Sequence, residues 1–180
     1  MQKALFLDRD GVINFDKGYV YKIDDFEFIH GIFKVCRHYM SLGFVIVVVT
    51  NQAGIARKYY TELDFHKLDL WMVSQFQKHN VDILQTYFCP HHPHKGFKGE
   101  NIKFKVKCIC RKPKPGLLYL ANREFNLDLK KSFFIGDSSN DYFAALKAKV
   151  KPIIINKNFK HNKKCVSKRN ILEAVNYIIN

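Results

Sequence analysis

The apolar run "FVIVVV" (residues 44–49) is the stretch that decides the fold class. It is continuous and rich in β-branched residues, which is typical of a parallel strand buried on both faces of a sheet. Gly43, directly before it, indicates the end of a helix predicted over residues 31–42. Shorter apolar runs predict further strands near residues 4–7, 83–88, 132–135 and 152–155.

Helical patterns lie between and after these runs. Thr61 can cap a long amphipathic helix that reaches about Asn80, and Pro115 opens another helix. Two more helices are predicted over residues 140–148 and 171–178, and an irregular stretch extends to Cys110. Strands that alternate with helices predict an α/β fold with a mostly parallel sheet flanked by helices.

Length and composition bound the class of protein. The chain has 180 residues, of which 47% are hydrophobic and 14% aromatic. Such a chain buries a sizeable core, so we expect one folded domain over residues 1–180 rather than a disordered chain. No apolar run is long enough for a membrane span or the core of a signal peptide, which makes a cytosolic location the default expectation.

The formal net charge of +14 needs an explanation. Basic residues gather from Lys95 to Lys114 and from Lys147 to Arg169, while no acid occurs from Tyr142 to Leu172. So basic a balance suggests nucleic acid, an acidic surface or a phosphorylated ligand as a partner. The second basic stretch is equally compatible with a solvated surface.

Polar residues follow several of the predicted strands or precede a helix, namely Asp8, Asp10, Thr50, Asn51, Lys112 and Asp137. In a parallel sheet the ligand site lies beyond the carboxyl ends of the strands, so these side chains are expected at one edge. Asp8 and Asp10 repel each other unless a cation or a shared proton lies between them. Carboxylates suit Mg²⁺, which makes Asp8, Asp10 and Asp137 candidate ligands.

The same residues can carry phosphoryl transfer. Asp8 can attack phosphorus and form an aspartyl phosphate, while Asp10 can protonate the leaving oxygen and later accept a proton from water. Thr50 and Asn51 can donate hydrogen bonds to the phosphoryl group, and Lys112 adds positive charge. Simpler interpretations exist for single residues, since Asp137 could cap a helix, Asp141 could be the cap or a support, and Lys112 could be solvated.

The order of these motifs resembles the haloacid dehalogenase (HAD) superfamily of phosphohydrolases. "DRDGVIN" is similar to its D-x-D-G motif, "VVVTNQAG" to its second motif, and "GDSSND" to its fourth, and Lys112 matches the third. The segments "KGYV" (17–20), "TNQAGIAR" (50–57), "YFCPHHP" (87–93) and "CRKPKPG" (110–116) resemble one subfamily. It contains the D-glycero-D-manno-heptose 1,7-bisphosphate 7-phosphatases and the histidinol-phosphate phosphatases, and the resemblance covers about residues 3–156.

The resemblance implies a Rossmann-like fold and a Mg²⁺-dependent phosphatase that acts on a small anionic substrate, in the heptose case during synthesis of a nucleotide-activated heptose for surface polysaccharide. It also implies substrate contacts, at Asp16, Lys17, Gly18, Tyr19, Asn51, Gln52, Ala53 and Arg111. The guanidinium of Arg111 suits phosphate geometry. We expect a monomer with no membrane partner.

A cysteine and histidine cluster predicts a zinc site. Cys89, Cys108 and Cys110 with one imidazole form a usual tetrahedral set, in which each short pair binds from one turn. Spacing alone leaves His91, His92 and His94 open as the fourth ligand, and the resemblance selects His91. A site with four protein ligands is structural, so zinc is expected to pin the loop over about residues 89–110.

The sixteen residues between His91 and Cys108 bear on the substrate. The resemblance implies a short segment there in histidinol-phosphate phosphatases and a longer one in the heptose enzymes, so the length favours the heptose interpretation. The loop lysines (Lys95, Lys98, Lys103, Lys105 and Lys107) either attract an anionic substrate or form the solvent face of a hairpin strand. A different class, a basic zinc protein that binds nucleic acid or acts as a polynucleotide 3′-phosphatase, is favoured by charge but not by the motifs.

Overall fold

The computed structural model describes residues 1–94, 99–156, 158–159, 166–168 and 170–177. Within these ranges the strands form one parallel sheet in the order β3-β2-β1-β4-β5-β6. The strands are β1 (Lys3–Leu7), β2 (Phe44–Asn51), β3 (Ile83–Cys89), β4 (Phe133–Gly136), β5 (Lys151–Ile155) and β6 (Val166–Lys168). The α-helices are α1 (Ile32–Ser41), α2 (Ala53–Ala56), α3 (Glu62–Lys78), α4 (Gly116–Phe125) and α5 (Ser139–Lys147). Short 3-10 helices are η1 (Ile23–Asp25), η2 (Ile102–Phe104), η3 (Leu129–Lys131) and η4 (Ile171–Tyr177).

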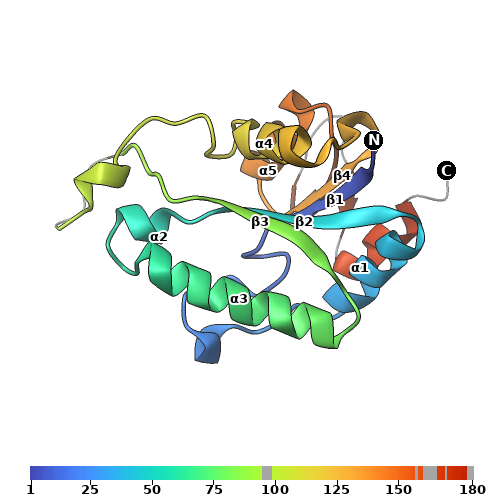
Figure 1. Ribbon diagram of the computed structural model, residues 1–180, viewed down its shortest axis with the longest axis horizontal. Helices are drawn as coiled ribbons and strands as arrows, with labels where there is room; N and C mark the ends of the chain where they lie inside the picture. Colours follow the sequence, from blue (N-terminus) through green and yellow to red (C-terminus); the bar gives the residue numbers. More distant parts are fainter. Residues whose placement is uncertain (95–98, 157, 160–165, 169, 178–180) are drawn as a thin grey trace.

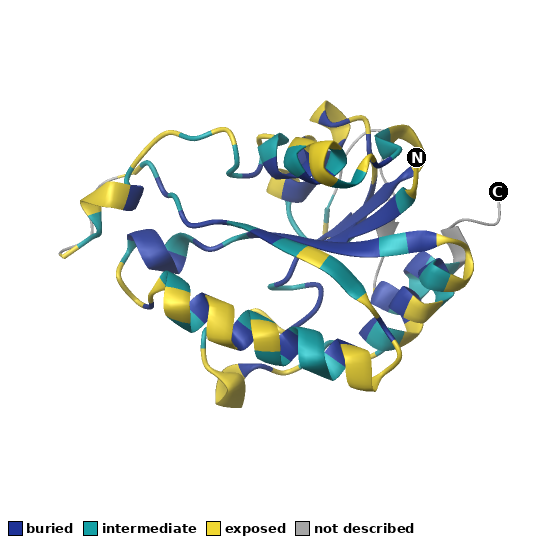
Figure 2. Cartoon of the chain, viewed as in Figure 1, coloured by how far each residue is buried: buried dark blue, intermediate teal, exposed yellow. Residues whose placement is uncertain are grey.

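Helices cover both faces of the sheet (Figure 1). Leu5 and Leu7 of β1 point into a core with α1, α3 and η4, whereas Ala4 and Phe6 point into a core with α4 and α5. Successive side chains of a strand face opposite sides, so a strand between two helical layers must be apolar throughout. β2 lies between β3 and β1 and is buried along most of its length (Figure 2), which explains its uninterrupted apolar run. The predicted α/β class is confirmed.

Local signals placed the helix ends well. Thr61 caps α3, because its hydroxyl oxygen accepts a hydrogen bond from the backbone N–H of Asp64 at 3.1 Å. In turn, the carboxylate of Asp64 accepts a hydrogen bond from the backbone N–H of Thr61 at 2.9 Å. Such reciprocal capping satisfies donors that the first turn leaves free. Gly43 has a φ of 80°, a conformation that suits glycine just beyond the end of α1.

The carboxyl-terminal region departs from the predictions. Residues 171–177 form the 3-10 helix η4 rather than the predicted α-helix, and residue 178 lies outside the described part of the chain. β6 pairs in parallel with β5, and no apolar pattern in this basic stretch predicted a strand. Helix α2 was also not predicted, since one short turn has no periodicity to detect. Across the part of the chain that is described, no helix has the length and apolar character needed to cross a membrane.

Candidate active site and metal centre

A cavity of about 450 Å³ opens at the carboxyl ends of the central strands. It brings together nearly all of the residues that the sequence singled out for chemistry and substrate contact: Asp8, Asp10, Asp16, Gly18, Tyr19, Thr50, Asn51, Gln52, Ala53, Arg111, Lys112 and Asp137. They come from the loops after β1 and β4, from the end of β2 and the start of α2, and from the segment before α4. The position agrees with the rule that parallel sheets bind ligands beyond their strand ends.

A buried ion-pair network lies at the base of the cavity. Lys112 Nζ is 2.8 Å from Asp8 Oδ1 and 2.7 Å from Asp141 Oδ1, and it also donates to the carbonyl oxygen of Val49 at 2.9 Å. Although burial acts to lower it, the pKa of Lys112 is raised, because the carboxylates of Asp141 and Asp8 outweigh burial. Lys112 therefore stays charged and is not a solvated lysine.

Negative charge exceeds positive charge in this network. Burial is the largest cause that raises the pKa of Asp8 well above its usual value, with Asp141 and Asp137 adding to it against the opposing effect of Lys112. The pKa of Asp137 is raised to about 6, first by burial and then by the charge of Asp141. One lysine cannot neutralise three carboxylates, so the site favours an additional cation.

The carboxylates have the geometry of a metal site. Oxygen atoms of Asp8, Asp137 and Asp141 lie within 4.8 Å of one another. Gly11 has a φ of 84°, and a Cβ there would lie 2.2 Å from Asp137 Oδ2, so glycine lets the Asp137 carboxylate approach the loop after β1 this closely. Hard oxygen ligands around an excess of negative charge fit Mg²⁺.

Asp141 has two tasks in this arrangement. Its Oδ2 accepts hydrogen bonds from the Ser138 hydroxyl at 2.6 Å and from the Ser138 backbone N–H at 3.1 Å, which completes the cap of α5. Its Oδ1 holds Lys112. Ser138, rather than Asp137, is the capping residue, which leaves the carboxylate of Asp137 available for the cavity.

Asp10 is oriented differently from the other acids. Its carboxylate accepts hydrogen bonds from Arg9 at 2.8 Å, from Asn14 at 3.1 Å and from Gln52 at 3.0 Å, and among the described residues it is not one of the converging carboxylates. The structure thus places the Asp141 side chain where the sequence suggested that of Asp10. A role for Asp10 in binding the metal stays a prediction, while its place beside Asp8 in the cavity suits an acid and base.

Two predicted substrate contacts have other partners in the structure. Asn51 lines the cavity, and its side-chain amide donates to the carbonyl oxygen of Lys112 at 3.1 Å and accepts from the Lys112 backbone N–H at 3.0 Å. Both ends of the amide are engaged, so Asn51 positions Lys112. Lys17 does not line the cavity, because its ammonium pairs with Glu27 at 3.0 Å and its side chain is 48% exposed.

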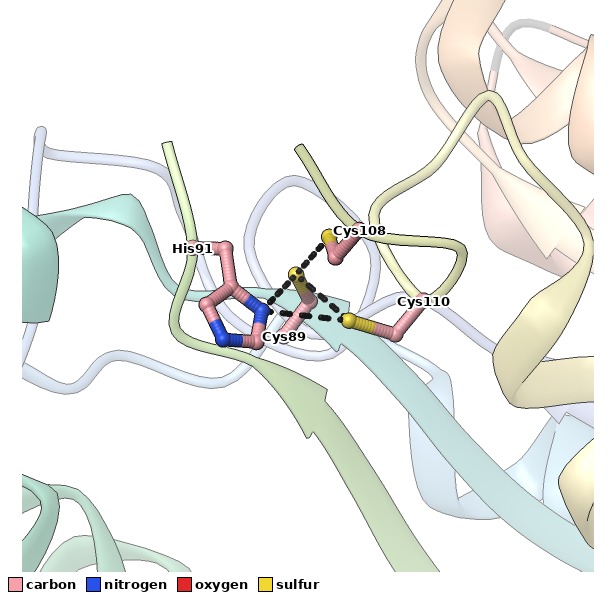
Figure 3. Close-up of side chains that lie close together, drawn as sticks. All are labelled: Cys89, His91, Cys108 and Cys110. Atoms are coloured by element: carbon pink, nitrogen blue, oxygen red, sulfur yellow. Dashed lines mark hydrogen bonds between the residues drawn. The ribbon is translucent and has the colours of Figure 1, made fainter. Parts of the chain in front are cut away.

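The predicted zinc ligands converge in space (Figure 3). Cys89 Sγ lies 3.6 Å from Cys108 Sγ, 3.2 Å from Cys110 Sγ and 3.6 Å from His91 Nδ1, and His91 Nδ1 lies 3.3 Å from Cys110 Sγ. Bonds of about 2.3 Å from zinc to sulfur place tetrahedral ligand atoms roughly 3.8 Å apart, close to these separations. These side chains therefore fit a closed, structural zinc site.

His92 and His94, the two competing imidazoles, are not among the converging ligands. The interactions of His92 show why. Its Nε2 is 3.2 Å from Arg57 Nη2, and its ring packs against that of His94. The zinc cluster is joined to the cavity by Arg111, which donates from Nη1 to the carbonyl oxygen of His91 at 3.1 Å. Pinning the loop thus orients the guanidinium at the cavity wall.

Residues 99–107, the part of the loop before Cys108 that the structure describes, do not form the hairpin strand considered above. Residues Ile102–Phe104 form a 3-10 helix, in which Ile102 is exposed and Phe104 is buried. Lys105 pairs with Glu100 at 2.6 Å, whereas Lys103 and Lys107 are exposed. Lys95 and Lys98 lie outside the described residues.

Some residues that line the cavity were not predicted as site residues, namely Arg57, Tyr60, Ser138, Asn140 and Asp141. Three of these lie inside the motif "GDSSND", so the motif itself was the available signal. Tyr60 lies in an irregular turn between α2 and α3, and no local pattern distinguishes it.

Fold and site together define a phosphatase of the HAD superfamily. The sequence profile of the family described as polynucleotide kinase 3 phosphatase matches residues 5–172. A D-glycero-alpha-D-manno-heptose-1,7-bisphosphate 7-phosphatase from Campylobacter jejuni is 46% identical over 97% of this chain and 95% of its own length. The corresponding beta-D-manno enzyme from Escherichia coli K12 is 46% identical over 82% of this chain and 75% of its own length. The chain belongs to the HAD phosphatase subfamily that contains these heptose enzymes.

A solved structure agrees with the fold. The D,D-heptose 1.7-bisphosphate phosphatase from B. bronchiseptica, complexed with magnesium and phosphate, superposes with a TM-score of 0.82. It is 24% identical and covers 97% of this chain and 96% of its own chain.

Proposed function

We propose that this protein is a Mg²⁺-dependent phosphatase that removes the 7-phosphate from D-glycero-D-manno-heptose 1,7-bisphosphate through an aspartyl phosphate on Asp8. The observation that carries the proposal is the contact of Lys112 with Asp8 at 2.8 Å, inside the cavity where the carboxylates of Asp137 and Asp141 converge with that of Asp8. The names of the relatives at 46% identity supply the substrate.

The chain's own groups account for the chemistry. Asp8 attacks the phosphorus atom while Lys112 and the hydroxyl of Thr50 stabilise negative charge on the phosphoryl oxygens. Asp10 donates a proton to the leaving 7-oxygen and then accepts one from the water that hydrolyses the aspartyl phosphate. Asp8 and Asp137 would hold Mg²⁺, whose charge would offset the repulsion between the attacking carboxylate and the phosphate.

A second cavity of about 440 Å³ supports a substrate with two phosphates. It shares Arg111, Lys112 and Asn140 with the first cavity. Within the described part of the chain its other charged lining side chains are lysines, Lys107, Lys114 and Lys147, and no carboxylate lines it. A positive wall beside the reacting group suits a second phosphate and disfavours the cationic amine of histidinol phosphate.

The test is a comparison of kcat/KM on four substrates with Mg²⁺ present: the α and β anomers of the heptose bisphosphate, histidinol phosphate, and a 3′-phosphorylated oligonucleotide. We expect one heptose anomer to exceed both other classes by at least about a hundredfold, or roughly 3 kcal/mol of transition-state binding. Relatives named for either anomer are equally identical, so both anomers are measured. Preference for the oligonucleotide, with steep loss of binding as salt rises, would overturn the proposal in favour of a nucleic-acid enzyme.

A further inference from the structure

We propose that Tyr60 is a positioning residue that orients the acid Asp10 and the hydroxyl of Thr50 through the amide of Gln52. This inference rests on the proposed phosphatase chemistry, in which Asp10 and Thr50 act directly. Tyr60 lies outside every motif that identified the site, and it is 6% exposed at the cavity.

The hydrogen bonds run in one direction. The Tyr60 hydroxyl donates to Gln52 Oε1 at 2.6 Å, and Gln52 Nε2 donates to Asp10 Oδ2 at 3.0 Å and to Thr50 Oγ1 at 2.8 Å. A primary amide has one acceptor and one donor end. By occupying the acceptor end, the tyrosine hydroxyl turns the donor end toward both reacting groups.

This orientation has a consequence for Thr50. A threonine hydroxyl has one hydrogen to donate and two lone pairs that accept. Because Gln52 donates to the oxygen of Thr50, the hydroxyl hydrogen is left to point at a phosphoryl oxygen. If the amide were reversed, Gln52 Oε1 would compete for that hydrogen and would also face the carboxylate of Asp10.

Packing holds the tyrosine in place. The ring of Tyr60 stacks on that of Tyr21, with centroids 5.2 Å apart and planes at 13°. A Cβ on Gly54 would lie 2.1 Å from Tyr60 Cε1, so only glycine lets the ring reach Gln52. Burial is the largest cause that raises the pKa of Tyr60, so the hydroxyl remains a donor at neutral pH.

Tyr60→Phe is the direct test, because it keeps the ring and its stacking and removes only the hydroxyl. We expect kcat on the heptose bisphosphate to fall roughly tenfold to a hundredfold with KM little changed, since orientation of reacting groups is lost. On p-nitrophenyl phosphate the leaving group needs no proton, so the deficit in kcat/KM, which reports only the steps that form the aspartyl phosphate, should shrink to the part owed to Thr50. Equal deficits in kcat/KM on both substrates would overturn the role through the acid Asp10.

Tyr87→Phe is the matched control. Tyr87 is also 6% exposed and its hydroxyl donates to Glu124 Oε2 at 2.7 Å, away from the cavity. The Tyr87→Phe variant should lose about as much stability as Tyr60→Phe and keep the kcat of the wild type. This outcome separates positioning of the reacting groups from a general effect of removing a buried hydroxyl.

A double-mutant cycle with Gln52→Glu tests the path. A glutamate still accepts from Tyr60 but cannot donate from its carboxylate, so we expect Tyr60→Phe to add little to the loss in kcat already caused by Gln52→Glu. Additive losses would show that Tyr60 acts independently of Gln52 and would overturn the inference. A wild-type protein that hydrolyses no phosphate monoester would instead overturn the proposed function, whereas an active wild type with an equally active Tyr60→Phe variant overturns this inference alone.

Discussion

The ammonium group of Lys112 lies 2.8 Å from Asp8 Oδ1, and both side chains are almost wholly removed from solvent. Asp8 and Lys112 are far apart in sequence. The side-chain amide of Asn51 makes two hydrogen bonds with the backbone of Lys112, one to its carbonyl oxygen and one from its N–H, and so positions Lys112 beside Asp8. Lys112 also forms an ion pair with Asp141, so its positive charge stabilises both the carboxylate of Asp8 and that of Asp141, which caps α5 with Ser138. The expected consequences can be measured one residue at a time.

Asp8→Asn should abolish turnover and leave the fold intact. The amide has nearly the shape of the carboxylate but is not a nucleophile, while Lys112 retains its pair with Asp141. We expect kcat to fall at least about a thousandfold, with thermal unfolding close to that of the wild type. Appreciable turnover by this variant in a phosphate-release assay would reject Asp8 as the nucleophile.

Lys112→Met should destabilise the protein as well as inactivate it. The change leaves buried carboxylates without their cation, and breaking such a pair costs about 3–5 kcal/mol. Chemical denaturation with and without Mg²⁺ measures the loss, which added Mg²⁺ should reduce. Lys131→Met removes an exposed lysine 3.6 Å from Asp128 and should change the free energy of unfolding by less than about 1 kcal/mol. Equal effects of the two changes would contradict the buried network.

The raised pKa of Asp137, about 6, predicts a dependence of stability on pH. The folded state binds more protons than the unfolded state between roughly pH 4 and pH 6, so this group lowers stability as pH rises through that window. Without Mg²⁺ the wild type should lose roughly 2 kcal/mol relative to Asp137→Asn between pH 4 and pH 7. Denaturation curves at several pH values test this, and a constant difference between the two proteins would exclude a perturbed Asp137.

The zinc cluster makes a prediction about composition. We expect about one zinc per chain by metal analysis, and Cys108→Ser or His91→Asn should remove it. Without zinc the loop is no longer held in place, so the free energy of unfolding should fall by about 2 kcal/mol, which lowers the melting midpoint by roughly 4–8 °C. His92→Asn is the control, because His92 contacts Arg57 instead, and this variant should keep its zinc. If the wild-type protein without zinc were as stable as the protein with zinc, the assignment of a structural zinc site would be refuted.

Arg111→Lys should affect binding more than chemistry. A lysine keeps the charge but loses the planar fork and the hydrogen bond to the carbonyl of His91. We expect KM for the heptose bisphosphate to rise about tenfold while kcat stays within about threefold, as measured by initial rates. A fall in kcat at unchanged KM would place Arg111 in the reaction itself.

Much of this protein was readable from the chain alone. The β-branched run at residues 44–49 predicted a doubly buried strand because burial on both faces requires an apolar side chain at every position. Asp8, Thr50, Lys112 and Asp137 could be placed at one sheet edge because parallel strands bring their carboxyl ends together. The spacing of the cysteines predicted the zinc cluster because each pair spans a single turn.

Orientation was decided only by the tertiary structure. The motifs did not predict that the Asp10 carboxylate accepts hydrogen bonds from Arg9 and Gln52. They also did not predict that the Asn51 side chain bonds to the backbone of Lys112, or that Asp141 joins the carboxylate cluster. Lys17 and Glu27 pair across separate segments, and Tyr60 reaches the site from a turn without any pattern. Local sequence determines where the chain bends and which faces are apolar, but the direction of a polar side chain depends on partners that become neighbours only when the whole sheet has formed.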